Sequence, residues 1–406
     1  MTRTVFAGGS VFDGTGAPPA RADVLVEGDR ILDVGIGLDG DESVDCAGAV
    51  LLPGLIDCHV HVAFTGPVAS ITDRVQKPFS YQFYEAAQNL RRTIELGITT
   101  VRDAGGADLG IKRAVQDGLI PGPRLQISVA AISQTGGHGD GWMPSSHCLA
   151  LFVEHPGRPA SIADGDAEVR KISRQLLRAG AEVLKVCATG GVLSPSDDPR
   201  HSQFTEDELR IIVTEAAMQG RYVMAHAQGS EGIKNALRAG VRSIEHGIYL
   251  DDEAIELMLA KDAWLVPTLI APIAVLRAIE AGAELPESVG RKAAEVAEVH
   301  ADSMRRAVEA GVRIAMGTDS GVGAHGTNLE ELPLMEACGM TPSQVLAATT
   351  SSAAELLGHG DTLGRLAPGY RADLVVVDGD PLARLADLPK LVREVWQDGR
   401  RVIEPN

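Results

Sequence analysis

Six polar side chains follow or interrupt short apolar runs of this chain, and residues of these types commonly surround divalent metal ions. They are His59, His61, Lys185, His226, His246 and Asp319. Taken singly, each has an ordinary structural explanation, such as a hydrogen-bonded histidine inside a protein core. Six of them at the ends of predicted buried strands are hard to explain in that way, and together they predict a metal centre.

The first two of these residues form an H-x-H pair after the apolar run Leu51 to Ile56. Because residues two apart in a strand point to the same face, the imidazoles of His59 and His61 can reach one ion. The pair alone does not separate a metal site from two hydrogen-bonded core histidines.

Lys185 is the only charged residue within the apolar run Val183 to Val186. A buried ammonium is costly unless it is paired, neutralised or modified. One interpretation is a salt bridge with a nearby Asp or Glu. The other is a carbamylated lysine whose carboxylate bridges two metal ions.

The elements that must position these residues alternate between strand and helix. Apolar strand candidates end near eight residues, which are His61, Asp103, Ser133, Lys185, His226, His246, Pro267 and Asp319. Amphipathic helices lie between them, for example Ala167 to Gly180 and Glu206 to Gly220. Alternating units predict an α/β protein with a parallel sheet, and eight units predict a closed, distorted (β/α)8 TIM barrel. Functional side chains of such a barrel lie at the C-terminal ends of its strands, where the six polar residues fall.

Local signals support this order of elements. Thr205 and Glu208 form a capping box, and Thr341 is followed by Pro342 at a first helical position. His226 and His246 are twenty residues apart, which is about the minimum for a strand–helix–strand repeat. We therefore expect these two histidines on adjacent strands.

Both ends of the chain have the pattern of short strands. Near the N-terminus, Val24 to Val26 and Arg30 to Leu32 flank the turn Glu27-Gly28-Asp29, as in a hairpin. The C-terminal candidates are Leu374 to Val377, Val392 to Trp396 and Arg400 to Ile403. This pattern predicts a small composite β-sandwich domain from residues 1–53 and 361–406, and a hydrolase barrel from residues 54–360.

The composition indicates a globular protein with an acidic surface. Among 406 residues, 45% are hydrophobic and 23% are charged, and the net charge is −18. This charge argues against nucleic acid and anionic membranes as partners, because binding phosphates requires clustered Lys and Arg. The five scattered cysteines contain no C-x-x-C pair. With no visible signal peptide or membrane-spanning apolar segment, the expected location is the reducing cytoplasm.

The set of strand-end residues resembles the signature of the amidohydrolase superfamily. The resemblance runs the length of the chain and includes the lead-in Leu52-Pro53-Gly54-Leu55-Ile56-Asp57. It implies two divalent metal ions, usually zinc, with His59, His61 and Asp319 on the first ion. His226 and His246 would hold the second ion. Lys185, carboxylated by carbon dioxide, would bridge the ions together with a hydroxide that attacks the substrate, and Asp319 would move the proton to the leaving amine.

Two further segments resemble the prolidase-like and Xaa-Arg carboxypeptidase-like branch that is related to imidazolonepropionase. They are Ser133 to Asp140 and Thr100 to Gly106. By this resemblance His138 would bind the substrate carbonyl and stabilise the oxyanion. Val192, in the segment Gly190 to Pro195, would form a wall of the substrate pocket.

The resemblance leaves the substrate open. Some prolidase-like members have Tyr where this chain has Gln228, whereas the loop Thr318 to Gly326, with His325, is more similar to enzymes that remove a C-terminal basic residue. Gln228 and His325 are therefore predicted substrate contacts. The expected substrate is a dipeptide or an N-acyl amino acid, and non-peptide amides, carbamates and ureas remain alternatives.

Two other functions are less consistent with the residues. Deaminase-like relatives have one metal, lack the fourth-strand Lys and have Glu three residues after the fifth-strand His, where this chain has Gly229. Metal-free scaffold relatives lack several ligands, whereas all are present here. The family resemblance also suggests a homo-oligomer acting on a small-molecule substrate.

Overall fold

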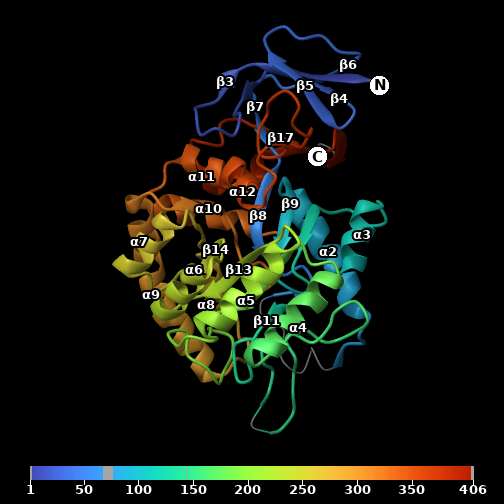
Figure 1. The fold of residues 1–406 in the computed structure, drawn as a ribbon. Coiled ribbons are helices and arrows are strands. Elements are labelled where there is room, and N and C mark those ends of the chain that lie inside the picture. The colour runs from blue at the N-terminus through green and yellow to red at the C-terminus, as the bar shows by residue number, and fades with distance from the viewer. Residues whose placement is uncertain (1, 67–75, 144, 404–406) are drawn as a thin grey trace.

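The structure, a computed structural model, describes residues 2–66, 76–143 and 145–403. It has two groups of elements, which Figure 1 shows one above the other. Strands from both termini lie at one end of the molecule, next to the labelled N and C, and the alternating strands and helices lie at the other end. The predicted α/β class is confirmed.

Parallel strands occupy the middle of the α/β part. They are β8 Leu55–Val60, β9 Ile98–Asp103, β10 Arg124–Ile127, β11 Ala131–Ile132, β12 Val183–Cys187, β13 Tyr222–Ala227, β14 Ser243–His246, β15 Trp264–Val266 and β16 Arg313–Ile314. They form two sheets, ordered β10-β9-β8 and β11-β12-β13-β14-β15-β16, in which every pair is parallel. The parallel sheet predicted from the sequence is therefore confirmed, and β13 and β14 are neighbours as expected.

Hydrogen bonds connect the two sheets at both edges. On one side Cys58 N in β8 donates to Met316 O, just after β16, at 2.9 Å. On the other side Glu182 N, just before β12, donates to Ile127 O at the end of β10, at 2.8 Å. The strands therefore place their C-terminal ends, and the side chains there, on one side of the molecule.

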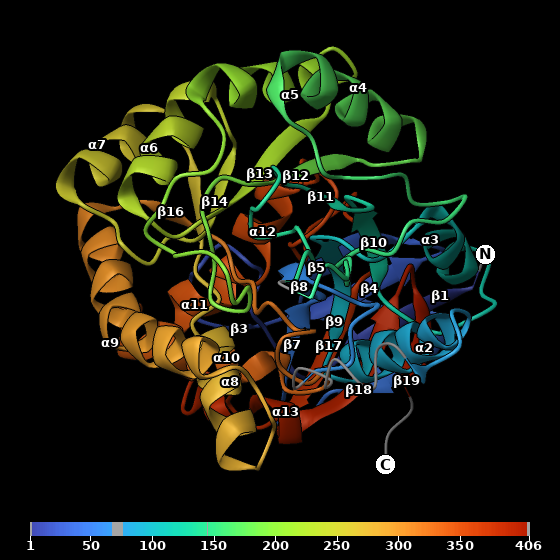
Figure 2. The same ribbon diagram turned by 90° about the horizontal axis from the view of Figure 1, so that it is seen from below.

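Helices lie along the outside of these strands, as Figure 2 shows for α4 to α9. The helices of this part are α2 Tyr81–Glu95, α3 Leu109–Gln116, α4 Gly165–Arg178, α5 Glu206–Ala217, α6 Ser230–Ala239, α7 Asp252–Ala260, α8 Ile270–Glu280, α9 Glu287–Ala310, η1 Asn328–Glu330, α10 Glu331–Ala337, α11 Pro342–Ala348 and α12 Ser351–Leu356. The predicted capping box of Thr205 and Glu208 at the start of α5 is confirmed, and so is the position of Pro342 at the start of α11. The structure adds a second capping box, formed by Thr341 and Gln344. Among the described residues, no helix is both long and apolar enough to cross a membrane.

The helices and strands share one large apolar core. Leu184 and Val186 of β12 belong to it, together with Leu176 of α4 and Leu209 of α5. Burying a side chain of this size contributes roughly 1.5–3 kcal/mol. Lys185 lies between Leu184 and Val186, so the alternation of the strand directs it away from these helices, toward the interior.

The terminal segments form two further sheets with the orders β5-β4-β1-β6 and β19-β18-β17-β7-β2-β3. Their elements are β1 Arg3–Ala7, β2 Ser10–Val11, β3 Ala20–Arg21, β4 Asp23–Glu27, β5 Arg30–Gly35, β6 Glu42–Asp45, β7 Ala49–Pro53, β17 Leu374–Asp378, η2 Leu385–Asp387, α13 Leu388–Leu391, β18 Val392–Gln397 and β19 Arg400–Ile403. The second sheet joins strands from both ends of the chain, and the first contains the predicted β4–β5 hairpin. The rings of Phe6 in β1 and Trp396 in β18 meet edge to face, with centroids 5.0 Å apart.

One strand differs from the sequence prediction. The predicted run Leu51 to Ile56 is split at Gly54: β7 pairs with β17 of the terminal sheet, whereas β8 starts at Leu55 and pairs with β9. A Cβ atom on Gly54 would lie 2.1 Å from the Thr99 hydroxyl oxygen and 2.9 Å from Asp373 Cβ. Glycine is therefore required where the chain passes from one sheet to the other.

Candidate metal centre

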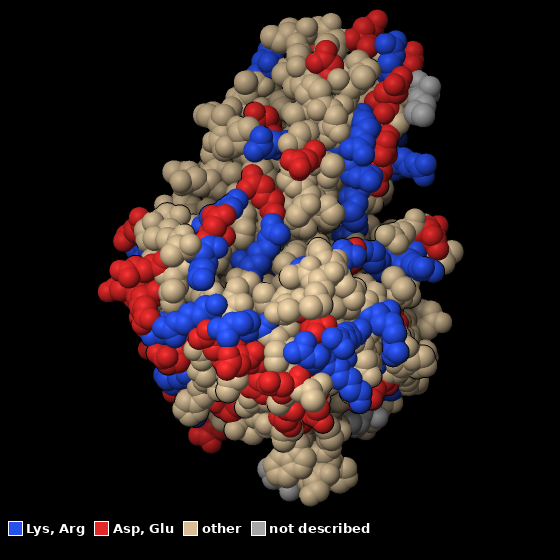
Figure 3. Space-filling model, in the orientation of Figure 1, with Lys and Arg blue, Asp and Glu red and all other residues tan. Residues whose placement is uncertain are grey.

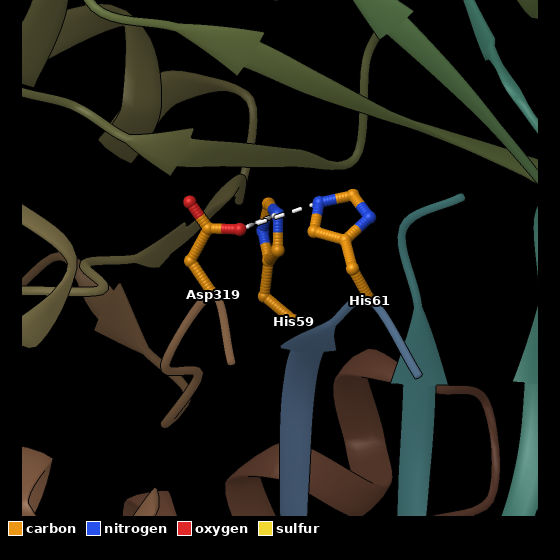
Figure 4. A group of neighbouring side chains, drawn as sticks. All are labelled: His59, His61 and Asp319. Atoms are coloured by element: carbon orange, nitrogen blue, oxygen red, sulfur yellow. Dashed lines mark ion pairs between the residues drawn. The ribbon is translucent and has the colours of Figure 1, made fainter. Parts of the chain in front are cut away.

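The three residues predicted to hold the first ion meet at the C-terminal end of β8. His59 lies in β8, His61 directly follows it, and Asp319 lies in the loop after β16. One ligand atom from each lies within 4.8 Å of the others. Asp319 Oδ1 is 3.5 Å from His59 Nε2 and 3.3 Å from His61 Nε2, and Figure 4 shows the carboxylate facing both rings.

The remaining predicted histidines continue from this group as a row of neighbouring rings. The centroids of His61 and His59 are 5.5 Å apart, those of His59 and His246 5.1 Å, and those of His246 and His226 4.6 Å. His138 ends the row, stacked on His226 at 4.3 Å with an interplanar angle of 16°. Residues from β8, β13, β14 and the loop after β11 are thus brought together.

On the β8 side, each imidazole uses Nδ1 to donate to a protein acceptor. His59 Nδ1 lies 2.6 Å from Glu245 Oε2, and His61 Nδ1 lies 2.7 Å from the Gly105 carbonyl oxygen. A carboxylate and a carbonyl oxygen can only accept, so the protons are on Nδ1. In the neutral form of each ring this leaves the lone pair on Nε2, the nitrogen that faces Asp319. Burial lowers the pKa of His61, but the hydrogen bond and charge of Asp319 outweigh burial, so the pKa is raised overall.

The other pair has a similar arrangement. His226 Nε2 donates to the Gly190 carbonyl oxygen at 3.0 Å, which leaves the lone pair on Nδ1. His246 Nδ1 lies 2.8 Å from the Thr268 hydroxyl oxygen. Burial lowers the pKa of His59, His226 and His246 well below the usual value. Neutral rings are the form that binds metal ions.

Glu245 and Arg102 support His59 from behind, and the sequence analysis did not identify them. Both side chains are fully buried. Arg102 Nη2 donates to both Glu245 carboxylate oxygens at 2.9 and 3.0 Å, and its Nε donates to the Cys58 carbonyl oxygen at 2.6 Å. Ser243 Oγ also donates to Glu245. This network fixes the carboxylate that orients the His59 ring.

Lys185 lies beside His59 and has no carboxylate partner among the described residues. Its side chain is buried, and its Nζ is 3.4 Å from His59 Nε2. Within the described part of the chain, no Asp or Glu oxygen forms an ion pair with it, so the salt-bridge interpretation is not supported there. Burial lowers the pKa of the Lys185 ammonium, and a neutral amine is the form that can react with carbon dioxide.

Asp319 has the properties of an unsatisfied ligand. Burial raises the pKa of its carboxyl group, but the neighbouring His59 and His61 outweigh burial, so the pKa is lowered overall. Oδ1 is buried and makes no hydrogen bond to a described residue. The backbone of Asp319 also has a φ of +59°, a conformation that non-glycine residues adopt at a cost and that is often found at functional sites. A buried carboxylate oxygen beside the Nε2 atoms of two imidazoles is a donor set that fits a divalent cation.

The predicted substrate contacts are placed differently from one another. Gln228 is buried at the end of β13, and its Oε1 has no hydrogen-bond partner among the described residues. Val192 is buried in a small apolar cluster with Ile248. His325 is buried, with Nδ1 3.2 Å from the Thr93 hydroxyl oxygen and Nε2 3.1 Å from the His61 carbonyl oxygen.

The placement of His325 therefore argues against the substrate contact predicted for it. Both of its ring nitrogens are engaged by protein atoms, and one of them supports the backbone of His61. A substrate contact would require breaking one of these hydrogen bonds inside the protein. His325 is better explained as support for the end of β8.

Residues 50–402 match the sequence profile of the amidohydrolase family. The chain belongs to this family. The amidohydrolase is 36% identical to ochratoxinase from Aspergillus niger, over 98% of this chain and 86% of the relative. It is 26% identical to imidazolonepropionase from Streptomyces avermitilis, over 97% of this chain and 91% of the relative. The predicted family and its relation to imidazolonepropionase are confirmed.

The likeness extends to solved structures. A crystal structure of a Xaa-Pro dipeptidase with methionine bound in its active site has a TM-score of 0.89 and 33% identity, and covers 98% of this chain and 99% of that chain. Prolidase-like enzymes are therefore structural neighbours of this amidohydrolase, as the sequence predicted. The protein is an enzyme that hydrolyses C–N bonds.

Proposed function

We propose that this amidohydrolase uses two divalent metal ions, zinc in the simplest case, to cleave the amide bond of a dipeptide or an N-acyl amino acid. The observation that carries this proposal is the convergence of His59, His61 and Asp319, with a buried Asp319 oxygen that has no hydrogen-bond partner among the described residues. The Nε2 atoms of His59 and His61 face Asp319, and each carries the lone pair of its ring in the neutral form. The structural similarity to a Xaa-Pro dipeptidase supports a peptide-like substrate.

Each predicted ligand has a place in this proposal. His59, His61 and Asp319 would hold one ion, and His226 and His246 would hold the other. Lys185, carboxylated by carbon dioxide, would connect the two ions. The absence of a carboxylate partner for Lys185 in the described residues, and its lowered pKa, support this role.

The reaction needs a nucleophile, a polarised carbonyl and a route for one proton. Divalent ions held by these residues would supply hydroxide near neutral pH and polarise the carbonyl. Asp319 lies next to His59 and His61, and its carboxylate would accept the proton of the attacking hydroxide and deliver it to the leaving amine. His138 ends the row of rings and would contact the scissile group.

The substrate would lie between the loops that follow β12, β13 and β14. Val192 and Ile248 belong to an apolar cluster that also includes Val322, after β16. Gln228 Oε1 offers a buried acceptor without a partner in the described chain. These features favour a ligand with an apolar part and an N–H or O–H donor, which a dipeptide or an N-acyl amino acid has.

The experiment is to incubate the zinc-loaded enzyme with a panel of dipeptides and N-acyl amino acids and to measure the released amine. We expect hydrolysis by the wild type, and a loss of several orders of magnitude in Asp319→Asn. Asp302→Asn is the matched control, because this aspartate is exposed and pairs only with Arg305 in the described chain. No hydrolysis of any member of the panel would contradict the peptide-like assignment and favour non-peptide amides, carbamates or ureas.

We also infer that the two parallel sheets form one closed, distorted (β/α)8 barrel of residues 54–360. The hydrogen bonds from Cys58 to Met316 and from Glu182 to Ile127 support closure at both edges. The two terminal sheets would form a composite β-sandwich from residues 1–53 and 361–406. An apolar cluster that includes Phe6, Val24, Leu51, Leu374 and Val376 supports packing between them.

We further propose a cytoplasmic homo-oligomer that acts on a small molecule, without nucleic acid or membrane partners. The net charge of −18 supports the absence of a polyanionic partner. On the face shown in Figure 3, Lys and Arg lie interspersed with Asp and Glu. All five cysteines are free thiols, which supports a reducing compartment.

A further inference from the structure

The loop between β12 and α5 surrounds His138 with hydrogen bonds that the proposed reaction does not use. His138 Nδ1 lies 2.7 Å from the Ser194 hydroxyl oxygen, and Ser194 in turn donates to Asp197 Oδ1. The second carboxylate oxygen, Asp197 Oδ2, lies 3.8 Å from His138 Nδ1. A carboxylate, a hydroxyl and an imidazole are thus connected in a line.

The same carboxylate also holds the backbone of His138. Gln203 Oε1 accepts from His138 N at 3.0 Å, and Gln203 Nε2 donates to Asp197 Oδ2 at 3.2 Å. Gly191 N donates to Asp197 Oδ2 at 3.3 Å. Asp197 therefore fixes the ring through Ser194 and the main chain through Gln203.

Lys292 of α9 anchors this loop from beneath. Its side chain is only 4% exposed. Its Nζ donates to the carbonyl oxygens of Gly191, Ser194 and Asp197, and lies 3.4 Å from Asp197 Oδ1. An ammonium has three N–H donors, and the three carbonyl oxygens use all of them, which holds the loop in one conformation.

The ring itself has no room to rotate. A Cβ atom on Gly191 would lie 2.2 Å from His138 Cε1, so the ring packs directly against the glycine backbone. Its other side stacks on His226. Protein atoms therefore cover both faces of the His138 ring.

The hydrogen-bond partners of His138 determine which of its two ring nitrogens carries the proton. An ionised carboxylate only accepts, so the single proton of Ser194 Oγ is directed to Asp197, and Ser194 must accept from His138. We propose that Ser194, Asp197 and Lys292 form a clamp that positions His138 with its proton on Nδ1 and presents Nε2 to the ligand. No described residue makes a hydrogen bond to Nε2 of this ring.

This tautomer changes the substrate contact that the sequence predicts for His138. The inference about that contact rests on the proposed amide hydrolysis. A neutral ring with its proton on Nδ1 has a lone pair at Nε2. It accepts a hydrogen bond from an N–H or O–H group, whereas donation to a carbonyl oxygen requires a proton on Nε2. The clamp thus makes His138 an acceptor for the N–H or O–H of the substrate or of the attacking water.

The test is the tautomer of His138 in the zinc-loaded enzyme, measured by long-range 1H–15N correlation spectra of protein with labelled histidine. The signal is assigned by its absence in His138→Gln. We expect a protonated Nδ1 and a bare Nε2 in the wild type. In Ser194→Ala and Asp197→Asn, the signal should move toward the other tautomer.

Matched controls lie beside the two clamp residues. Ser196 and Asp198 are next to them in the same loop and are more exposed, so Ser196→Ala and Asp198→Asn should leave the spectrum unchanged. A proton on Nε2 in the wild type, or an unchanged signal in both clamp variants, would overturn the proposal. The spectrum does not depend on turnover, so the clamp can hold even if the panel of amides is not hydrolysed, and it can fail even if the panel is hydrolysed.

The kcat of Ser194→Ala distinguishes a positioning role of Ser194 from a role in folding. With correctly folded protein and unchanged zinc content, Ser194→Ala should lower kcat by about 10–100-fold, because misplacing a reacting group by about an ångström has an effect of this size. A variant that loses zinc or unfolds in parallel with its activity would indicate a structural role for Ser194 and contradict the clamp.

Discussion

Replacing Glu245 by glutamine is expected to weaken both the fold and the metal site. Glu245 is fully buried and is the only carboxylate that pairs with Arg102 among the described residues. Glutamine has the same shape but no charge, so it leaves a buried guanidinium without its counter-charge. Breaking a buried ion pair from one side costs roughly 3–5 kcal/mol. Glutamine also offers one acceptor oxygen in place of two, so it cannot accept from His59, Arg102 and Ser243 as the carboxylate does. Weakened support of a metal-binding histidine lowers metal affinity by about 10–100-fold.

Two measurements follow from these magnitudes. The free energy of unfolding is obtained from urea titration of the metal-free protein, and zinc affinity is obtained by competition with a chromogenic chelator. Glu253→Gln is the control, because this glutamate pairs with Lys234 and Arg238 at the surface, and we expect no change in either quantity. If Arg102→Met is combined with Glu245→Gln, the loss of stability should be smaller than the sum of the single losses.

One outcome would show that Glu245 does not have this role. Glu245→Gln would have to retain the wild-type unfolding free energy within about 1 kcal/mol and the wild-type zinc affinity. Glu245 would then be a spectator of the site rather than the support of His59.

Two other predictions concern the surroundings of the site. Glu331 accepts from two backbone N–H groups at the start of α8, and burial raises its pKa to about 8. Its proton therefore stabilises the fold at low pH, and this contribution is lost as the pH rises from about 4.5 to about 8. The melting temperature of Glu331→Gln, relative to that of the wild type, should thus rise between pH 5 and pH 8. If the difference between the two melting temperatures does not change with pH, the raised pKa of Glu331 is contradicted. Gly191→Ala should lower turnover while zinc content stays at the wild-type value, because the new methyl group displaces the His138 ring; unchanged kinetics would show that the ring does not need this position.

The residues of the candidate metal centre could be selected from the sequence because each is a polar residue in or just after an apolar strand. That signal depends only on local sequence, and the parallel strands bring such residues to one side of the sheet. The same signal marks Arg102, which is followed by Asp103 at the end of buried strand β9, and Glu245 in buried strand β14. This signal led to Lys185 being singled out as a candidate, whereas Arg102 and Glu245 were not. Their pairing could not be found locally, since 143 residues separate them.

The clamp around His138 has no such local signal. Ser194 and Asp197 lie in a segment rich in Ser, Pro and Asp, which is typical of a solvated loop. Lys292 lies on an amphipathic helix, where a lysine is ordinarily exposed. Only the packing of α9 beneath the loop buries these groups. Strand limits were also beyond local reasoning at Gly54, because β7 and β8 belong to different sheets.

Divalent metal ions held by the residues of the candidate metal centre are expected to carry out the amide hydrolysis. The most direct test removes metal with a chelator and then measures amine release, with the best amide from the panel, at increasing equivalents of zinc. We predict no activity in the metal-free protein and a rise that reaches its plateau at about two ions per chain. Full activity without metal, or a plateau at one ion, would contradict the account of a two-metal centre.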